Sequence, residues 1–85
     1  MSYDKVMQFR TQLVIGIKQT IKAIKNYEIQ EVFIAKDVDY HITEKLIETA
    51  KQFEVPYVFV DSKKKLGKAC GIEVGASVAA IKHEG

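Results

Sequence analysis

Cysteine and proline are nearly absent from this sequence of 85 residues, which contains one of each. The single cysteine, Cys70, has no partner for an intramolecular disulfide bond, and with His41 and His83 it does not give the spacing of a zinc site. The single proline, Pro56, lies between two apolar segments rather than inside one. We therefore expect no metal and no other cofactor.

Long hydrophobic runs are also missing. No apolar stretch approaches the ~20 residues that a helix needs to cross a bilayer. The amino-terminal sequence MSYDKVMQFR is polar rather than signal-like, and the chain contains no linker, internal repeat or low-complexity tract. We expect a single domain over residues 1–85, located in the cytoplasm and without a membrane partner.

The formal net charge is only +2, but the charges are distributed unevenly along the chain. Residues 28–61 contain eight acidic side chains against three lysines, whereas lysines without acidic neighbours occur on both sides of this segment. These flanking lysines are Lys18, Lys22, Lys25, Lys63, Lys64, Lys65 and Lys68. If the fold brings both groups together, they form one anion-binding face, and the acidic segment faces elsewhere.

Hydrophobic spacing predicts an alternation of helices and strands. We expect helices at 3–10, 17–26, within 37–53 and at 62–71, and strands at 13–15, 32–35, 57–60 and 76–81. Ser2, Asp39 and Ser62 are candidate N-caps, and Gly71 suits a helix end. The apolar runs at 32–35 and 57–60 predict buried strands. The apolar stripe of the long helix consists of Ile42, Leu46, Ile47, Ala50 and Phe53. This alternation indicates an α/β fold with helices on both faces of one sheet.

The stretch KKKLGKACGIEVG at 63–75 places three lysines in the first turn of the helix that Ser62 caps. The helix macrodipole disfavours cations there by ~0.3 to 1 kcal/mol each. Such a loss without structural gain is typical of functional sites, and free NH groups at a helix start favour anions. The alternative is a solvated lysine run on an ordinary surface.

A second lysine-rich helix start lies in GIKQTIKAIK at 16–25. Gly16 allows the backbone to come close to a ligand, Lys18 and Gln19 lie near the helix start, and Lys22 follows Lys18 by one turn. All four could face one partner. The alternative is an amphipathic helix with a lysine-rich polar face, which is the interpretation we prefer for Lys25.

The loop at 71–75 carries two branched apolar side chains between glycines. With Gly71 as a left-handed cap, Ile72 would fold back on Leu66. Val74 has no such explanation, and apolar loop residues beside a basic helix can pack against an unstacked base.

Catalytic motifs are absent. Gly67 and Lys68 are followed by Ala69, so they do not form a phosphate-binding P-loop, and no Rossmann fingerprint occurs. Cys70 lies late in a short helix and is expected in the core rather than as a nucleophile. Without a base, a nucleophile or a metal set, we expect that the chain is not an enzyme.

Three stretches, GIKQTIKAI, VFIAKDVDY and VPYVFVDSKKKLGKACGIEV, closely resemble the ribosomal protein L7Ae superfamily, which binds kink-turn RNA. Small stand-alone bacterial members of the YbxF type look most similar, over about residues 5–82. The resemblance implies a three-layer α/β/α sandwich with a four-stranded mixed sheet. In that fold the helix start after the first strand lies beside the loop that precedes the last strand.

The resemblance also implies roles for particular residues. The segment from Gly16 to Lys22 would enter the widened major groove at tandem sheared G·A pairs, and Lys63 would meet the phosphate backbone. The 72–75 loop would pack on a flipped-out nucleotide, near which some relatives place an acid at the position of Asp39. The expected RNA-binding residues are Gly16, Lys18, Gln19, Lys22, Asp39, Lys63, Lys65, Ile72, Glu73, Val74 and Gly75.

One departure from the family pattern affects the G·A site. Archaeal and eukaryotic relatives show Gly-x-Asn-Glu-x-x-Lys, whereas Lys18 and Gln19 stand in place of Asn-Glu here. Lys18 can only donate hydrogen bonds, and Gln19 accepts without the charge of a carboxylate.

The leading hypothesis is therefore a non-enzymatic, monomeric protein that recognises kink-turns in ribosomal or regulatory RNA, with the ribosome as a candidate partner. The alternative is a protein–protein interaction module of the same fold within a ribonucleoprotein complex. A phosphoester enzyme that uses the lysine-rich helix start is a third interpretation.

Overall fold

Four strands form one mixed sheet in the computed structural model, which describes residues 6–83. They are β1 (Leu13–Ile15), β2 (Ile29–Ala35), β3 (Tyr57–Val60) and β4 (Val78–Lys82), and their order in the sheet is β1-β4-β2-β3. β4 is antiparallel to both β1 and β2, while β2 and β3 are parallel. β1, β2 and β3 therefore all run in the same direction.

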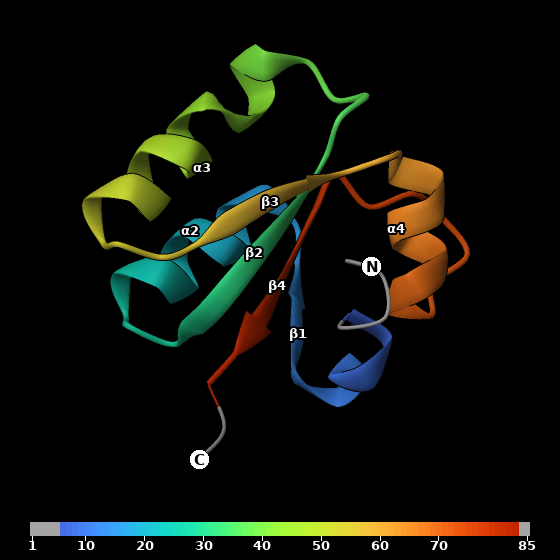
Figure 1. The fold of residues 1–85 in the computed structure, drawn as a ribbon, viewed down its shortest axis with the longest axis horizontal. Coiled ribbons are helices and arrows are strands. Elements are labelled where there is room, and N and C mark those ends of the chain that lie inside the picture. The colour runs from blue at the N-terminus through green and yellow to red at the C-terminus, as the bar shows by residue number, and fades with distance from the viewer. Residues whose placement is uncertain (1–5, 84–85) are drawn as a thin grey trace.

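Helices cover both faces of this sheet (Figure 1). α2 (Ile17–Lys25) and α3 (Tyr40–Gln52) lie together on one face, and α4 (Lys63–Cys70) lies on the other. The short 3-10 helix η1 (Arg10–Gln12) leads into β1. This arrangement confirms the predicted three-layer α/β/α sandwich.

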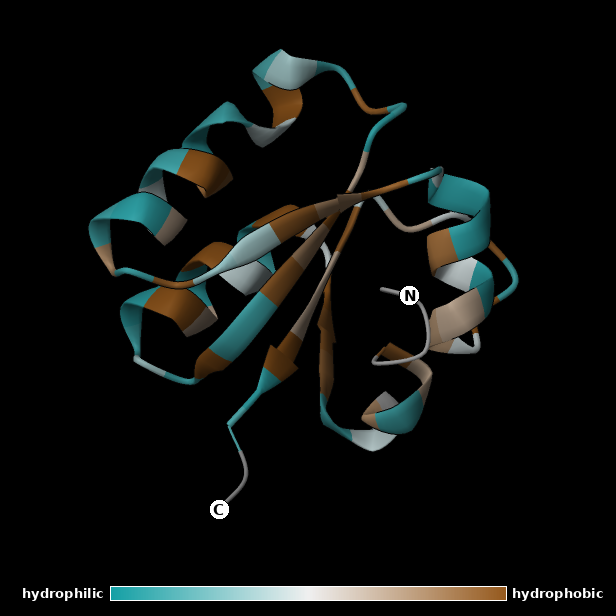
Figure 2. Cartoon of the chain, in the orientation of Figure 1, coloured by the Kyte–Doolittle hydropathy of each residue, from teal (hydrophilic) through white to brown (hydrophobic). Residues whose placement is uncertain are grey.

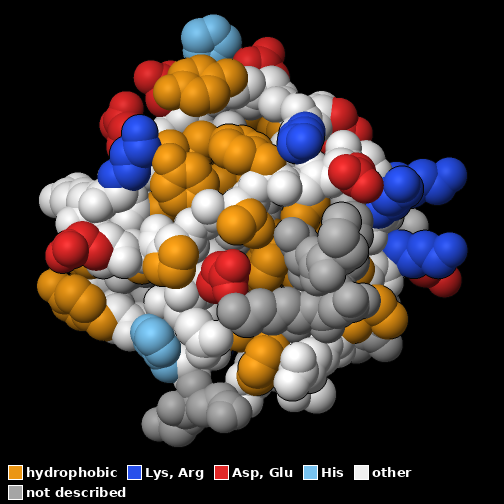
Figure 3. All heavy atoms as spheres, in the orientation of Figure 1, with side chains coloured by type: hydrophobic (Ala, Val, Ile, Leu, Met, Phe, Trp, Pro, Cys, Tyr) orange, Lys and Arg blue, Asp and Glu red, His pale blue; other side chains and the backbone are white. Residues whose placement is uncertain are grey.

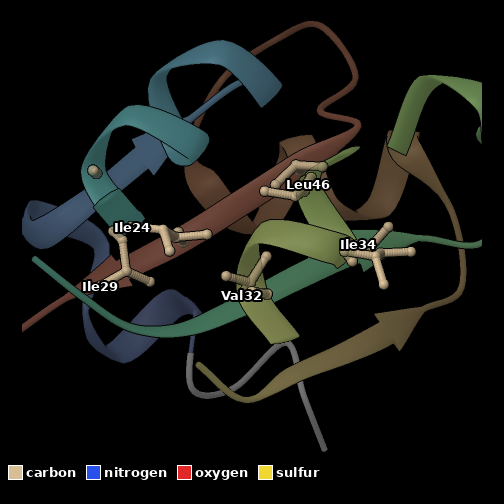
Figure 4. Packing of buried hydrophobic residues seen from close by; sticks show 10 residues of the cluster. Ile24, Ile29, Val32, Ile34 and Leu46 are labelled. Atoms are coloured by element: carbon tan, nitrogen blue, oxygen red, sulfur yellow. The ribbon is translucent and has the colours of Figure 1, made fainter. Parts of the chain in front are cut away.

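The layers are held together by two apolar clusters, one on each face of the sheet. Val32 and Ile34 of β2 pack with Ile24 of α2 and Leu46 of α3 (Figure 4), whereas Phe33 packs in the cluster of α4. This alternation follows from the pleat of a strand, which points successive side chains to opposite faces. Figure 2 shows the matching pattern on the helices, whose sides toward the sheet are apolar and whose outer sides are polar.

The predicted helix ends agree with the structure. The Asp39 carboxylate accepts a hydrogen bond from the His41 NH (2.9 Å), and the Ser62 hydroxyl accepts one from the Lys65 NH (3.2 Å). Gly71 adopts a left-handed conformation, with φ of 84°. Its NH donates to the Lys68 carbonyl, and the next NH along the chain donates to the Gly67 carbonyl. This pair of bonds forms a Schellman motif.

Two of the four strands have bounds that differ from the predicted ones, and β4 also ends one residue later, at Lys82. β2 begins at Ile29, three residues before the expected start at Val32. β4 begins at Val78 rather than Ala76, because the Ala76 NH donates to the Lys63 carbonyl and not to a neighbouring strand.

The prediction that residues 57–60 form a buried strand is wrong. β3 lies at the edge of the sheet and, within residues 6–83, has a neighbouring strand only on the β2 side, and Phe59 is 47% exposed. Figure 3 shows a group of hydrophobic side chains in the middle of the face that carries β3. An apolar run indicates a strand but does not say whether the strand is central or at an edge.

Two helix predictions also need correction. Residues 6–8 are helical, but the chain turns at Phe9, so the first helix ends before Arg10; its earlier part and Ser2 lie outside the described residues. In α3, Leu46, Ile47 and Ala50 are buried as predicted, whereas Ile42 is 54% exposed. Within residues 6–83, no helix is long and apolar enough to cross a membrane.

Candidate functional site

Four connections of the chain meet at one edge of the sheet. Because β1, β2 and β3 run in the same direction, their carboxyl ends lie together, and the amino end of the antiparallel β4 lies beside them. We call this edge the carboxyl edge. It carries the start of α2, the loop between β2 and α3, the start of α4 and the loop that leads into β4 (Figure 1).

Residues 76–78 connect these segments through three backbone hydrogen bonds. The Ala76 NH donates to the carbonyl of Lys63 (3.0 Å), the Ser77 carbonyl accepts from the Ala35 NH (2.9 Å), and the Val78 carbonyl accepts from the Gly16 NH (3.1 Å). The starts of α2 and α4 therefore meet at the same edge, although the two helices cover opposite faces. The side-by-side placement that the resemblance implies is present.

The start of α2 depends on Gly16. Its φ of 102° and ψ of 154° lie in a region that is nearly restricted to glycine. A Cβ at this position would meet only the Gln19 side-chain oxygen, at 3.6 Å, so within the protein itself the glycine is needed for its conformation and not for space. Sequence reasoning missed Thr20, which is fully buried and donates its hydroxyl hydrogen to the Gly16 carbonyl (2.6 Å). A threonine four residues after a helix-starting glycine is a weak signal for such a bond.

The first turn of α2 is open to an anion. It has no side-chain cap and no acidic residue, and the NH groups of residues 17–19 have no hydrogen-bond partner within residues 6–83. Lys18, Gln19 and Lys22 are exposed, and neither lysine forms an ion pair within that range. Free NH groups, the helix dipole and two lysines all favour negative charge at this point.

The start of α4 differs from what the sequence predicts. The Lys63 NH donates to the Asp37 carboxylate (2.9 Å), and the Lys65 NH donates to the Ser62 hydroxyl, so these NH groups are not free for an external anion. Asp37 lies in the loop after β2, and this loop is next to the start of α4 at the carboxyl edge. Its negative charge offsets the unfavourable position of the three lysines in the first turn. Anion binding at α4 therefore cannot use these two NH groups and depends more on lysine side chains than it does at α2.

The prediction that the acidic segment faces elsewhere is wrong for three of its residues. Asp37 caps α4, Asp39 caps α3 at the same edge, and Asp61 lies 3.6 Å from the Lys65 amine. The Asp61–Lys65 pair is two-thirds exposed and contributes at most about 1 kcal/mol. Acidic and basic side chains are thus interspersed at the carboxyl edge, and Lys63 has no ion pair within residues 6–83.

The 72–75 loop runs back along α4 toward the carboxyl edge (Figure 1). Val74 is 71% exposed, as predicted, and Ile72 packs against the cluster that contains Leu66, also as predicted. Gly67, which sequence reasoning missed, makes this path possible. A Cβ on Gly67 would lie 2.2 Å from the Val74 carbonyl oxygen, and one on Gly75 would lie 3.2 Å from the Lys63 Cβ.

The candidate residues thus fall into two groups. Most lie at or near the carboxyl edge, on the starts of α2 and α4, on the loop before α3 and on the end of the 72–75 loop. Ile72 is different, because it follows the carboxyl end of α4 and packs into the core cluster. The exposed candidates are Lys18, Gln19, Lys22, Asp39, Lys63, Lys65, Glu73, Val74 and Gly75. Cys70 is buried, as expected, and residues 6–83 contain no group of His, Cys, Asp and Glu that could hold a metal ion.

Comparison with known proteins assigns this arrangement to a family. Residues 2–85 match the Ribosomal protein L7Ae/L30e/S12e/Gadd45 family. The chain belongs to this family. Membership in the L7Ae family also confirms the expectation that the chain is not an enzyme.

Bacterial relatives match nearly the whole chain. "RNA-binding protein BH0128" of Halalkalibacterium halodurans is 52% identical over 82 residues, which cover 96% of this chain and 99% of that protein. "RNA-binding protein YbxF" of Geobacillus stearothermophilus is 53% identical over 81 residues, which cover 95% of this chain and 98% of that protein. The predicted similarity to YbxF-type members of the L7Ae family is confirmed.

A solved structure shares the fold. The "15.5kD RNA binding protein" of Giardia lamblia superposes with a TM-score of 0.92 at 29% sequence identity, over 98% of this chain and 72% of that chain. The three layers and the mixed sheet of this L7Ae family member therefore agree with an independently solved relative.

Proposed function

We propose that this protein binds RNA and that it recognises kink-turns in ribosomal or regulatory RNA through the carboxyl edge. The observation that carries the proposal is the bridge formed by residues 76–78, which joins the starts of two lysine-rich helices. The names of the bacterial relatives and of the Giardia protein support RNA as the ligand.

We propose that the start of α2 contacts the tandem G·A pairs of the kink-turn. Its uncapped NH groups and the amines of Lys18 and Lys22 attract phosphates, while the Gln19 amide can both donate to and accept from base edges. Gly16 keeps this turn free of a Cβ on the side where the backbone meets the RNA. Because Gln19 replaces a carboxylate, we expect a weaker interaction with guanine NH groups than in archaeal and eukaryotic relatives.

We propose that the start of α4 and the 72–75 loop bind the RNA strand that leaves the kink. Lys63 and Lys65 extend toward phosphates, and the exposed side chain of Val74 packs on a flipped-out nucleotide. Asp39 ends the β2–α3 loop, in which Asp37 bonds to the start of α4, and its exposed carboxylate can accept hydrogen bonds from that base. The remaining members of the loop, Ile72, Glu73 and Gly75, shape its backbone.

The physiological setting is part of the same proposal. We expect the chain to act as one RNA-binding domain, as a monomer in the cytoplasm, on the ribosome or on a regulatory RNA. Sequencing of the RNA that copurifies with the tagged protein would identify the target.

Titration with two radiolabelled RNAs tests kink-turn recognition. One carries a kink-turn, and the other has its tandem G·A pairs replaced by Watson–Crick pairs. We expect the second RNA to bind at least tenfold more weakly, because only the first offers a bend and a flipped-out base. Equal affinities would leave only non-specific electrostatic binding and would contradict the proposal.

A further inference from the structure

An apolar groove lies between α2 and α3, on the face of the sheet opposite α4. It has a volume of about 490 Å³, within the range of ordinary binding sites. Its floor consists of Ile17, Ile21 and Ile42. Its rim consists of Lys18, Lys22, Lys25 and Lys45, and among residues 6–83 no acidic side chain lines it.

Ile42 is the feature of this groove that the fold leaves unexplained. Its position in the helical stripe of α3 predicts burial, yet 54% of its surface is exposed, while Leu46 one turn later is fully buried. Ile17 and Ile21 of α2 line the same groove, but they are themselves partly buried against the core cluster, to which Ile42 does not belong. An exposed isoleucine beside two further isoleucines can bury apolar surface against a partner.

The rim adds a second, independent property. The amines of Lys22, Lys25 and Lys45 form no ion pair with any residue from 6 to 83, and the same holds for Lys18. Four unpaired cations around an apolar floor favour an occupant that is acidic on its edges and apolar at its centre.

We propose that this groove docks an acidic amphipathic helix of a partner protein. One or two apolar side chains of that helix pack on Ile21 and Ile42, and its carboxylates face the four lysines. Helices that lay an apolar stripe into a groove are a common mode of peptide recognition. The docking does not depend on the proposed RNA function.

The isoleucine floor favours a protein over RNA as the occupant. Phosphates could neutralise the lysines, but the outer surface of an RNA stem is polar and would leave Ile42 uncovered. An acidic amphipathic helix can cover the isoleucines of the floor with its apolar side chains and neutralise the lysines of the rim with its carboxylates.

A synthetic peptide provides a direct test. The probe is a fluorescein-labelled helix of about 18 residues with leucines every three or four positions and glutamates on its flanks. The control peptide has the same composition with the leucines scattered around the helix. We expect fluorescence anisotropy to show saturable binding of the first peptide and at least tenfold weaker binding of the second. Absence of saturable binding, or equal binding of both peptides, would overturn the proposal.

Matched protein variants locate the binding. Ile42→Gln should weaken peptide binding about tenfold, whereas Met7→Gln, which removes an equally exposed apolar side chain elsewhere, should leave it unchanged. The double variant Lys25→Gln, Lys45→Gln should also weaken it about tenfold, whereas Lys51→Gln, Lys68→Gln, with the same change in charge, should change it less than twofold. Equal effects of the groove and control variants would overturn the proposal.

The same variants separate this proposal from the proposed RNA function. Ile42→Gln should leave kink-turn RNA affinity unchanged, and the Lys25 and Lys45 substitutions should reduce it no more than the control pair. If the groove variants weaken RNA binding selectively and the peptide does not bind, the groove belongs to the RNA surface and the docking proposal is wrong. Failure of the G·A titration with intact peptide binding would reject only the RNA function.

Discussion

Lys63 joins three segments of the carboxyl edge through its backbone. Its NH donates to Asp37, its carbonyl accepts from Ala76, and its Cβ lies against Gly75. The side chain remains exposed. Because the backbone is held on both sides, the position of the Lys63 Cα is set by the β2–α3 loop and by the segment at 75–76 together.

The contact between Asp37 and Lys63 predicts a stability effect. Asp37→Ala removes a cap and a negative charge from a helix start that carries three lysines, so the free energy of unfolding should fall by about 1 kcal/mol. Asp37→Asn keeps an acceptor but loses the charge, and its effect should be smaller. Urea unfolding of the three proteins measures this, and wild-type stability of Asp37→Ala would show that the bond contributes nothing.

The open first turn of α2 predicts a salt effect. Replacement of Lys18 and Lys22 by alanine should weaken kink-turn binding. It should also lower the slope of log affinity against log salt by about 0.7 to 0.9 for each phosphate that the variant no longer neutralises. Lys51→Ala is a suitable control, because this exposed lysine lies in the last turn of α3, far along that helix from the carboxyl edge. A slope that stays the same in the double variant would argue against phosphate binding by these lysines.

At the scale of elements, the helix starts and ends follow from local sequence. Capping depends on the residue type and on its immediate neighbours in the chain, and the predicted caps within residues 6–83 are all present: Asp39, Ser62 and Gly71. Features that depend on residues distant in the sequence cannot be predicted from such local patterns. The edge position of β3 and the exposure of Ile42 depend on which elements become neighbours, and apolar periodicity contains no information about that.

The interior glycine of α4 gives a further prediction. Alanine normally stabilises a helix interior by about 0.5 to 1 kcal/mol relative to glycine. At Gly67 the new Cβ would lie 2.2 Å from the Val74 carbonyl oxygen, and a clash with backbone costs about 1 to 3 kcal/mol. Gly67→Ala should therefore lower stability and displace the 72–75 loop, with weaker RNA binding. Lys68→Ala on the same helix should change stability by less than about 0.5 kcal/mol, and a stabilised Gly67→Ala protein would contradict this account.

At the scale of the whole molecule, the order of charges along the sequence predicted two cationic segments but could not place them in space. Strand order and direction bring both to the carboxyl edge, and before the structure only the family resemblance indicated that the two segments lie side by side. The same topology brings Asp37 and Asp61 to the lysines, so the predicted separation of charges along the sequence does not persist in space. The charge pattern of a chain therefore needs its topology before it predicts a surface.

The groove and the carboxyl edge share Lys18 and Lys22, although they face different partners in our proposals. A partner bound at either site would neutralise these two lysines and leave less positive charge for the other site. The RNA and the acidic helix should therefore weaken each other's binding by the same factor.

The three consecutive residues that bridge the starts of α2 and α4 fix the span between them, since neither helix can shift without breaking bonds to the same short piece of backbone. In the RNA complex that we propose, the two helix starts would keep this spacing. The protein would then bind those RNA conformers whose curvature already matches, and the entropic cost of bending would fall mainly on the RNA.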